Sequence, residues 1–367
     1  MRILEVSPYV DPKRGGQEKH VLALSKTLSR LGQVVTVATC GHYDSRDQEG
    51  LEFVKIDSKQ ILGLCFPSVD KLIDFISTNK FDICHVHHAT LFGETVLTIN
   101  KTCSLPTVTT LHSLMLRELP ARFLYDRISL RIVSELSKKV ICLSQNIMLD
   151  LVRRGLERPK CVVIPNAIDV QSLGEQFRKI DNESEPNFDL LFVGRLERRK
   201  GIHWLLESLS LLHSQGKRYT LGIVGRGPLE KDVRDMIFSN NLGRYVTLFG
   251  YISENELLEC FSLARCVVIP SLYEGVPTVA LEAIAAEKPL VVSDIPGLNE
   301  LVINERNGLL VTPMDIQGLS SAIERILSSS DCLVSSADVN REILARFDWE
   351  VVARKILETY QRSLNLI

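Results

Sequence analysis

Apolar residues follow two different spacings along this chain. Short runs such as Cys266-Val-Val-Ile269 are apolar at every position, which is typical of strands buried on both faces of a parallel sheet. The segments between these runs repeat apolar residues every three or four positions, as amphipathic helices do. We expect strands at residues 3–6, 34–39, 53–56, 83–86, 107–111, 140–143, 162–164, 190–193, 221–224, 247–249, 266–269, 290–292 and 309–311. Their alternation with helices predicts an α/β protein with parallel sheets covered on both faces.

The predicted strands fall into two groups that a polar stretch separates. Residues 171–187 include Asp181-Asn-Glu-Ser-Glu-Pro186, and their composition predicts a linker. A chain of 367 residues is also too long for one ordinary core. We therefore expect two doubly wound, Rossmann-like domains, at residues 1–170 and 188–346, which face each other across a cleft. The apolar positions 351, 352, 356, 357 and 360 predict a last amphipathic helix within residues 347–367.

Composition indicates where the protein works. Hydrophobic residues make up 45% of the chain and charged residues 24%, as in folded soluble proteins. No run of about 18 apolar residues occurs, so we expect no transmembrane segment, and Glu5 interrupts any apolar signal region at the start. The nine cysteines are odd in number and form no C-x-x-C pair, which is typical of a reducing compartment. We therefore expect a cytoplasmic protein whose cysteines act as small apolar residues.

The net charge is −2, but it is shared unevenly along the chain. Residues 1–165 carry 22 Lys+Arg and 17 Asp+Glu, whereas the rest of the chain carries 21 and 28. The excess of cations indicates an anionic partner for the first half, such as a membrane surface, although ordinary surface variation explains it equally well.

Residues 114–139 interleave Arg122, Arg127 and Arg131 with apolar residues. This pattern fits a helix lying on an anionic membrane, or an ordinary helix with its apolar stripe in the core. No nucleic-acid partner is expected.

The most informative segment is Ser271-Leu-Tyr-Glu-Gly-Val-Pro-Thr-Val-Ala-Leu-Glu282, which joins a predicted strand to a predicted helix. Glu274 would lie at the carboxyl end of the strand, facing the crevice where open α/β sheets bind ligands. The N–H groups of Val276, Thr278 and Val279 would open the helix and attract phosphate. Glu282 lies about two turns further in. One carboxylate for sugar hydroxyls, a helix start for phosphate and a second carboxylate for ribose suit a sugar nucleotide. The simpler alternative is a helix with two surface glutamates.

A basic loop follows the predicted strand at residues 190–193. Its sequence is Gly194-Arg-Leu-Glu-Arg-Arg-Lys200, so Arg195 and Lys200 would lie at the carboxyl edge of the same sheet. The Arg fork matches phosphate oxygens, and Lys supplies a mobile point charge. Such cations can stabilise a departing diphosphate without a metal ion. Arg198 and Arg199 fit a solvated basic loop instead.

Glycines and histidines mark the strand ends of the first half. Gly15 and Gly16 follow the first strand and allow close approach to a phosphate, or only a tight turn. His112 ends the predicted strand at residues 107–111, where an imidazole can hydrogen-bond a hydroxyl. Histidines at positions 85, 87 and 88 suggest zinc, but no carboxylate or Cys partner is evident, so we expect no metal site there.

The order and spacing of these motifs resemble the signature of the large retaining glycosyltransferase family 4, whose members share the two-domain GT-B fold. The matching segments span almost the whole chain: Gly15-Gly16, Ile164-Pro-Asn-Ala-Ile-Asp169, Phe192-Val-Gly-Arg-Leu-Glu-Arg-Arg-Lys-Gly201, Ile223-Val-Gly-Arg-Gly-Pro228, Leu248-Phe-Gly250, Glu274-Gly-Val-Pro277 with Leu281-Glu-Ala283, Pro296-Gly-Leu-Asn-Glu300 and Phe347-Asp-Trp-Glu350. Ala167 and Glu287 depart from the pattern by replacing glycines that are usual there, so they bear on loop geometry more than on chemistry.

The resemblance implies a role for each candidate residue. Glu274 and His112 would contact the transferred sugar, Glu282 the ribose, and Arg195 with Lys200 the diphosphate. Gly15 and Gly16 would close over the donor phosphates, and either His87 or His88 would face the acceptor. The remaining donor contacts would come from Gly194, Gly225, Tyr251, Ile252, Gly275, Val276, Pro277 and Thr278. The last helix would cross back onto the first domain.

We therefore expect a retaining hexosyltransferase that uses a nucleotide-diphosphate sugar (UDP-hexose, UDP-GlcNAc or GDP-mannose) and a glycan or lipid-linked acceptor. No cofactor and no metal are expected, and the lack of an Asp-x-Asp motif argues against the metal-dependent GT-A class. The alternatives are an epimerase or hydrolase of the same fold, a nicotinamide-dependent oxidoreductase, and a non-catalytic sugar-nucleotide-binding protein. Glu230 stands where the third Gly of a dinucleotide fingerprint would be, which argues against the oxidoreductase.

Overall fold

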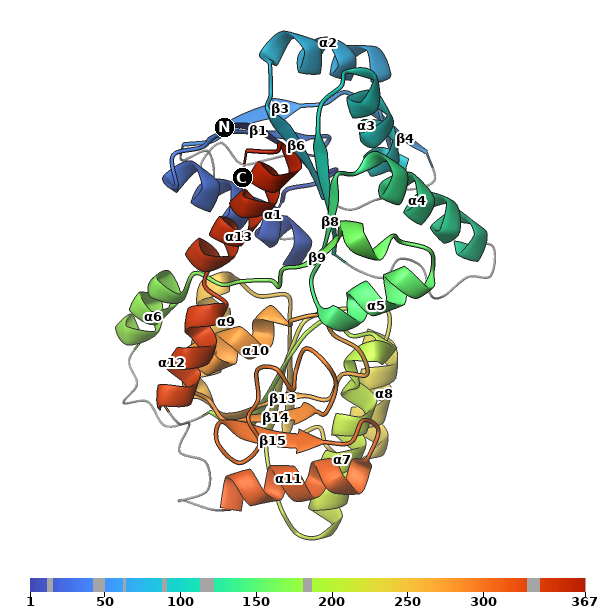
Figure 1. Cartoon of the computed structure of the whole chain (residues 1–367). Helices are drawn as coiled ribbons and strands as arrows, with labels where there is room; N and C mark the ends of the chain where they lie inside the picture. The colour runs from blue at the N-terminus through green and yellow to red at the C-terminus, as the bar shows by residue number, and fades with distance from the viewer. Residues whose placement is uncertain are drawn as a thin grey trace. The chain divides into compact units, whose positions relative to one another are not determined.

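The structure is a computed structural model. It describes residues 1–11, 16–41, 50–61, 64–87, 91–112, 122–180, 187–328 and 337–366. The chain divides into two compact units (Figure 1). Unit 1 comprises Met1–Ala167 together with Trp349–Ile367, and unit 2 comprises Ile168–Asp348. The end of the chain thus belongs to the same unit as its beginning.

Unit 1 is built on a seven-stranded parallel sheet with the strand order β3-β2-β1-β6-β7-β8-β9. The strands are β1 Arg2–Val6, β2 Val34–Thr39, β3 Glu52–Lys55, β6 Ile83–His87, β7 Thr107–Leu111, β8 Lys139–Cys142 and β9 Cys161–Val163. The order reverses beside β1, because β2 pairs with one edge of β1 and β6 with the other. The carboxyl ends of β1 and β6 therefore flank a switch point, which is where open α/β sheets bind ligands.

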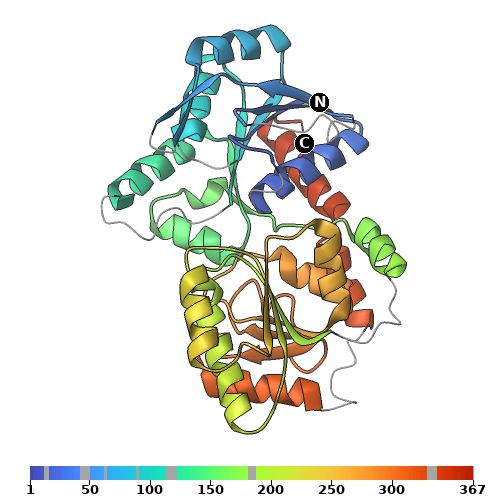
Figure 2. The ribbon, with the colours of Figure 1, turned by 180° about the vertical axis from the view of Figure 1, so that it is seen from behind.

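The helices of unit 1 are α1 Gly16–Arg30, α2 Val69–Asn79, α3 Leu91–Thr102, α4 Arg122–Leu136, α5 Gln145–Arg153 and α13 Trp349–Ser363. The last of these, α13, lies beside α1 in both views of the ribbon (Figures 1 and 2). Val352, Ile356 and Tyr360 repeat at helical spacing and are fully buried with Leu24 and Leu28 of α1. Their burial provides the physical reason why α13 joins unit 1.

Unit 2 contains a six-stranded parallel sheet in the order β12-β11-β10-β13-β14-β15. Its strands are β10 Phe188–Val193, β11 Leu221–Val224, β12 Val246–Gly250, β13 Ala264–Ile269, β14 Leu290–Ser293 and β15 Gly308–Val311. Its helices are α6 Val170–Lys179, α7 Ile202–Ser214, α8 Glu230–Ser239, α9 Glu254–Leu263, α10 Thr278–Ala285, α11 Ile316–Ser328 and α12 Ala337–Arg346. Successive residues of β10 enter two different apolar clusters, Leu190 in one and Leu191 in the other. The sheet is therefore covered on both faces.

The predicted α/β class and the two doubly wound parallel sheets are confirmed, and each predicted strand is present with bounds shifted by two residues at most. The apolar pattern did not reveal the antiparallel hairpin of β4 Ser58–Ile61 and β5 Leu64–Pro67. Each of its strands has only four residues, which is too short to establish a period.

The predicted linker at 171–187 needs correction, because residues 170–179 form helix α6 within unit 2. Asp169 caps this helix by accepting a hydrogen bond from the Ser172 N–H at 2.9 Å. Phe177 is buried against the core of unit 2, with Val170 and Leu173 packed beside it. A polar composition concealed this narrow apolar face. The acidic stretch 181–186 lies outside the described residues.

Glu287, one of the two departures from the family pattern, adopts a left-handed backbone with φ of 56°. It follows α10, where the Lys288 N–H bonds the Ala283 carbonyl and the Glu287 N–H bonds the Ile284 carbonyl. These two bonds form a Schellman motif, whose left-handed residue is usually Gly. The usual glycine at this position thus has a conformational reason, which Glu287 violates at a cost of about 1 kcal/mol.

Candidate active site

The switch point of unit 2 holds a largely buried ion pair. Strand β10 leads into the basic loop and the adjacent strand β13 leads into the Glu274 loop, so both begin at the same edge of the sheet. Lys200 Nζ lies 2.5 Å from Glu274 Oε1, and Ser271 Oγ donates to the same oxygen at 2.8 Å. Only 7% of the Glu274 side chain and 16% of the Lys200 side chain are exposed. Two of the predicted site residues are thus in direct contact.

Arg195 and Arg199 flank this ion pair in different ways. The Arg195 side chain is 68% exposed, and its closest carboxylate, Glu197 Oε2, lies 3.9 Å from Nε. Arg199 Nε bonds Glu197 Oε1 at 2.7 Å, and its Nη1 lies 3.8 Å from Glu274 Oε2. The prediction that Arg199 belongs to a solvated loop was therefore incomplete. Its sequence neighbours gave no signal of this contact, because it joins residues 75 positions apart.

Two glycines hold the loops of this edge close together. Gly225 has φ of 130°, and a Cβ there would lie 2.0 Å from the Gly194 carbonyl oxygen. Gly297 has φ of 91°, and a Cβ there would lie 1.6 Å from the Gly275 carbonyl oxygen. Neither position accepts a side chain without moving backbone. The Gly194 and Gly275 loops therefore owe their positions to glycines contributed by two other loops.

Helix α10 begins at Thr278, with Pro277 as its N-cap residue. Thr278 and Val279 lie in its first turn, where backbone N–H groups lack intrahelical acceptors. Thr278 is half-buried, and Val276 and Pro277 are buried. Glu282 lies at the fifth helical position and is half-buried. The helix start and Glu282 follow Glu274 as the sequence predicted, although Val276 precedes the helix.

The predicted base contacts differ in exposure. Tyr251, which directly follows β12, is 59% exposed, so its ring can meet a ligand. Ile252 is half-buried and packs against the apolar core of unit 2. Tyr251 is therefore the better placed of the two for stacking on a nucleotide base.

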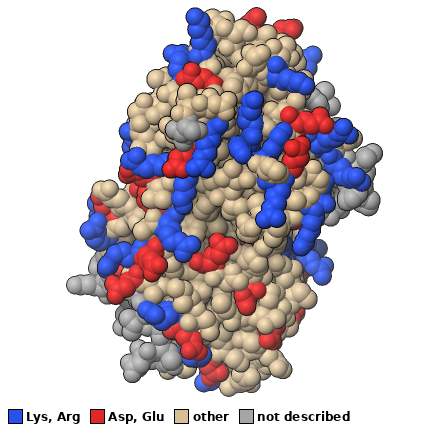
Figure 3. All heavy atoms as spheres, viewed as in Figure 1, with Lys and Arg blue, Asp and Glu red and all other residues tan. Residues whose placement is uncertain are grey.

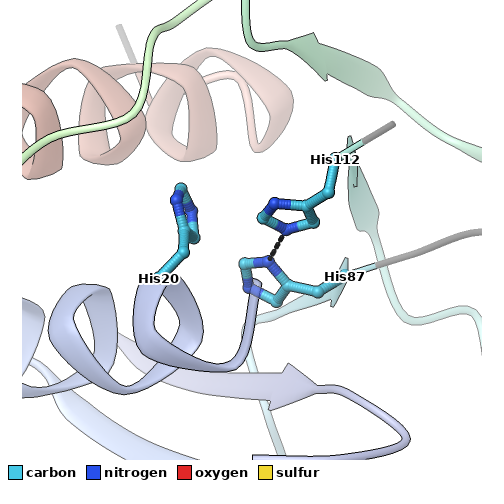
Figure 4. A group of neighbouring side chains, drawn as sticks. All are labelled: His20, His87 and His112. Atoms are coloured by element: carbon cyan, nitrogen blue, oxygen red, sulfur yellow. Dashed lines mark hydrogen bonds between the residues drawn. The ribbon is translucent and has the colours of Figure 1, made fainter. Parts of the chain in front are cut away.

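Unit 1 carries a different kind of polar cluster at its own switch point. Glu5 of β1 is fully buried and accepts a hydrogen bond from His87 Nε2 at 2.6 Å. His87 Nδ1 lies 3.1 Å from Nε2 of His112, which follows β7 (Figure 4). Glu5 accepts the hydrogen bond from His87 Nε2–H, so the Nδ1 of neutral His87 carries a lone pair. This Nδ1 therefore accepts a hydrogen bond from His112 Nε2–H. Neutral His112 is then left with an unprotonated Nδ1.

The other oxygen of Glu5 is held by the last helix. Tyr360 OH of α13 donates to Glu5 Oε1 at 3.0 Å and lies 2.6 Å from His85 Nδ1. His85 Nε2 in turn lies 2.7 Å from Thr110 Oγ1. Burial would raise the pKa of Glu5, but the charges and hydrogen bonds of His85 and His87 outweigh it and hold that pKa well below its usual value. The carboxylate therefore stays ionised inside the unit.

His20 of α1 joins this cluster, and no sequence motif singled it out. Its Nδ1 lies 2.9 Å from Asn166 Oδ1, and its ring centroid lies 4.6 Å from that of His112 (Figure 4). Burial lowers the pKa of His20 to about 3 and that of His87 to about 4, with neighbouring imidazoles adding to the effect. Both rings are therefore neutral near pH 7.

Three other candidates of unit 1 are Gly15, Gly16 and His88. Gly15 and His88 lie outside the described residues. Gly16 begins α1 and is exposed, and a Cβ there would meet no atom within 4 Å. Packing therefore gives no reason for a glycine at position 16.

The basic segment of unit 1 forms helix α4. Leu130 and Val133 are buried, so part of the apolar stripe lies in the core, as the ordinary-helix interpretation required. Ile128 is nevertheless 51% exposed, beside the exposed Arg127 and Arg131. Figure 3 shows many Lys and Arg side chains over unit 1 in the region of α4. Of the helices in the described ranges, none combines the length and apolar character that crossing a bilayer requires.

Comparisons with known proteins match both units. The family described as Glycosyltransferase Family 4 matches residues 14–172, and the family described as Glycosyl transferases group 1 matches residues 174–341. An uncharacterized glycosyltransferase of Methanocaldococcus jannaschii is 26% identical over 96% of this chain and 96% of its own. The phosphatidyl-myo-inositol mannosyltransferase of Mycolicibacterium smegmatis is also 26% identical, over 98% of this chain and 94% of its own. The Anabaena HepE protein, crystallised with UDP and glucose or with UDP-glucose, aligns over 99% of this chain and 100% of its own, with a TM-score of 0.78 and 20% identity.

Proposed function

Because this chain belongs to the glycosyltransferases of family 4 and group 1 and has their GT-B fold, we propose that it is a retaining hexosyltransferase. The donor would be a nucleotide-diphosphate sugar such as UDP-hexose, UDP-GlcNAc or GDP-mannose, and the acceptor a glycan or a lipid-linked sugar. The observation that carries this proposal is the largely buried pair of Lys200 and Glu274 at the switch point of unit 2. A similar nucleotide sugar, UDP-glucose, is bound by the Anabaena relative.

The diphosphate would bind between Arg195 and Lys200. The guanidinium of Arg195 is exposed, and among the described residues its ion-pair contact is a carboxylate at 3.9 Å, so it is well placed to bind an anion. Lys200 is neutralised by Glu274 in this structure. Sugar hydroxyls that bind Glu274 would leave the Lys200 ammonium to the phosphate oxygens. These two cations would then stabilise the charge that develops on the leaving diphosphate, so we infer that the transfer step needs no metal ion.

The rest of the donor would lie along the neighbouring loops. The first N–H groups of α10 suit a phosphate, and Glu282 suits the ribose hydroxyls. Tyr251 offers an exposed ring to the base. Gly16 would let the backbone at the start of α1 approach the donor phosphates closely.

His112 would contact the transferred sugar. Because His112 donates to His87 through Nε2–H, the Nδ1 of neutral His112 would accept a hydrogen bond from a sugar hydroxyl. We assign no nucleophile to the opposite face of the sugar. Retention would instead follow a same-face route, in which the leaving phosphate takes the proton of the acceptor hydroxyl.

The test is a panel of UDP-, GDP- and ADP-sugars, first by thermal shift and then by product analysis. A donor at 100 times its dissociation constant should stabilise the protein by about 2.7 kcal/mol. Incubating the stabilising donor with glycan and lipid-linked acceptors should give an α-linked product from an α-linked donor, with turnover unchanged by excess chelator. Inverted product would refute retention, and free hexose or an epimerised donor would favour the hydrolase or epimerase. Loss of turnover in chelator that magnesium restores would refute the metal-free step.

A further inference from the structure

Three imidazoles of unit 1 converge from three different elements. His20 comes from α1, His87 from β6 and His112 from the residue after β7, and their rings lie close together in Figure 4. Each ring offers one nitrogen, and these three nitrogens all lie within 4.8 Å of one another. The distance between His87 Nδ1 and His112 Nε2 is 3.1 Å. Two nitrogens bound tetrahedrally to one zinc ion at 2.0–2.1 Å would be about 3.3 Å apart.

His20 has a ring nitrogen without a hydrogen-bond partner among the described residues. The side chain is 5% exposed, and its Nε2 is fully buried. Since Nδ1 donates to Asn166 Oδ1 at 2.9 Å, neutral His20 carries a lone pair on Nε2. Leaving such a group unsatisfied is unfavourable, so a buried lone pair of this kind indicates a ligand.

A second layer of polar groups orients the rings. Glu5 Oε2 accepts from His87 Nε2 at 2.6 Å and thereby directs Nδ1 toward His112. Asn166 Oδ1 accepts the hydrogen bond from His20 Nδ1–H and so orients the His20 ring with its lone pair on Nε2. Histidines that bind metals almost always donate their other ring N–H to a carboxylate or carbonyl in this way. The sequence alone showed no carboxylate partner for these histidines, because Glu5 precedes His87 by 82 positions.

From these contacts we infer that His20 Nε2, His87 Nδ1 and His112 Nε2 bind one divalent transition-metal ion, with water as a fourth ligand. Three neutral imidazoles suit zinc, copper or nickel rather than magnesium or calcium, which prefer oxygen. Zinc is the appropriate probe because it accepts a tetrahedral site without redox chemistry.

Metal binding would change the hydrogen bonding of His112. In the metal-free protein its Nε2–H donates a hydrogen bond to His87 Nδ1. On metal binding this proton moves to Nδ1 of the same ring, so no proton is released. Nδ1 then donates rather than accepts. If His112 serves the sugar as proposed above, zinc inhibits transfer, and this site is separate from the metal-free diphosphate step.

The binding test uses the full chain after metal stripping, with zinc measured by competition against a colorimetric chelator. We expect one zinc ion per chain. His20→Gln should weaken zinc binding at least 10-fold, and Glu5→Gln by about 10- to 100-fold through His87. His203→Gln in α7 of unit 2 is the matched control and should bind zinc as the wild type does. Failure of the wild type to bind zinc, or unchanged binding by His20→Gln, would overturn the inference.

Further measurements keep the test decisive. Cobalt in place of zinc should give the visible absorption of a four-coordinate ion without a thiolate charge-transfer band, and such a band would assign the ion to cysteines instead. Circular dichroism and metal-free melting show whether His20→Gln folds. If it does not, His112→Gln, at a half-buried position, replaces it.

Zinc should lower turnover in the wild type and not in His20→Gln, whereas equal inhibition of both would refute the inhibitory role. Binding is measured without donor or acceptor, so its outcome does not depend on the proposed reaction.

Discussion

The two units place opposite kinds of polar groups on the same kind of sheet. In unit 2 the switch point holds charged side chains, Arg195 exposed and Lys200 paired with Glu274. In unit 1 it holds a buried cluster of imidazoles, in which the carboxylate of Glu5 accepts hydrogen bonds from His87 and Tyr360. Unit 1 carries 25 Lys+Arg and 19 Asp+Glu, whereas unit 2 carries 18 and 26. The cations of the proposed diphosphate site are therefore local features of an acidic unit.

This difference in charge agrees with the two kinds of ligand proposed above, a diphosphate for unit 2 and a sugar hydroxyl for unit 1. A cation that must meet a phosphate stays near water or keeps a partner it can exchange, because a buried unpaired charge is too costly. A group that meets a neutral sugar can be buried, provided that a hydrogen-bond network fixes its protons. The following predictions separate the two arrangements, beginning with the largest expected effect.

Removing the cations of unit 2 should have the largest effect. Arg195→Ala and Lys200→Ala should each lower kcat about 100- to 1,000-fold, because each removes a preorganised charge that stabilises the leaving diphosphate. Arg198→Ala, on the same loop, is the control and should retain near-normal kcat. Steady-state kinetics with the donor found by thermal shift gives the measurement. Near-normal turnover in both folded variants would show that this loop does not bind the diphosphate.

Unit 1 should unfold in acid before unit 2. Burial lowers the pKa of His20 to about 3 and of His87 to about 4, from an ordinary value of 6.5. Between each folded pKa and 6.5, these histidines bind more protons in the unfolded chain than in the folded one. The stability that the neutral, buried rings contribute is therefore complete above pH 6.5 and is lost as the pH falls toward 4 for His87 and 3 for His20. Each ring contributes up to about 1.4 kcal/mol per pH unit.

One tryptophan in each unit makes this measurable, with metal-free protein. Trp204→Phe leaves Trp349, whose ring lies 4.9 Å from that of His20, as the reporter of unit 1. Trp349→Phe leaves Trp204 as the reporter of unit 2. Fluorescence titrations should place the acid midpoint of unit 1 at the higher pH. Coincident midpoints would mean that the histidine cluster does not govern acid stability.

The two glutamates of unit 2 should separate the sugar from the nucleotide. Glu274→Gln should impair transfer while the bare nucleoside diphosphate still binds, because Glu274 is assigned to sugar hydroxyls. Glu282→Gln should weaken the nucleoside diphosphate itself, by about 10-fold for a lost hydrogen bond to a charged group. Calorimetric titration measures the dissociation constants of the nucleoside diphosphate and of the donor for each variant. Equal losses for both ligands in both variants would remove the distinction.

Helix α4 tests whether the basic surface of unit 1 meets a membrane. If it does, the chain should sediment with anionic liposomes and not with neutral ones, and added salt should release it. Replacing Arg127 and Arg131 with Gln should reduce binding about 10- to 30-fold, at about 1 kcal/mol for each charge. Lys231→Gln with Arg234→Gln on α8 of unit 2 is the control. Equal sedimentation with both lipid types, or with neither, would leave α4 as an ordinary helix.

The smallest effect should come from relieving the backbone at Glu287. Glu287→Gly should raise the free energy of unfolding by about 0.5–1 kcal/mol, because Gly accepts the left-handed conformation at φ of 56° without strain. Glu287→Ala keeps the strain and should give no gain. Urea unfolding of unit 2 followed by Trp204 measures both. A Gly variant no more stable than the Ala variant would contradict this account.

Local patterns predicted much of the fold. The apolar runs gave each strand of both parallel sheets, because a strand buried on both faces must be apolar along its length. They missed β4 and β5, whose four-residue strands carry no period, and they missed α6, whose apolar face is narrow within a polar segment. The spacing from Glu274 to Glu282 placed Glu274 in the loop before α10 and Glu282 within that helix.

The sequence by itself determined the α/β class, the glycosyltransferase family and the residues of unit 2 that lie at one sheet edge, because each follows from a strand and the loop directly after it. Only the tertiary structure decided which side chains meet. It joined Lys200 to Glu274, brought Arg199 beside them, and assembled Glu5, His20, His87 and His112 with Tyr360 of the last helix. These residues lie tens to hundreds of positions apart, and their contacts depend on strand order and helix packing, which no local spacing encodes.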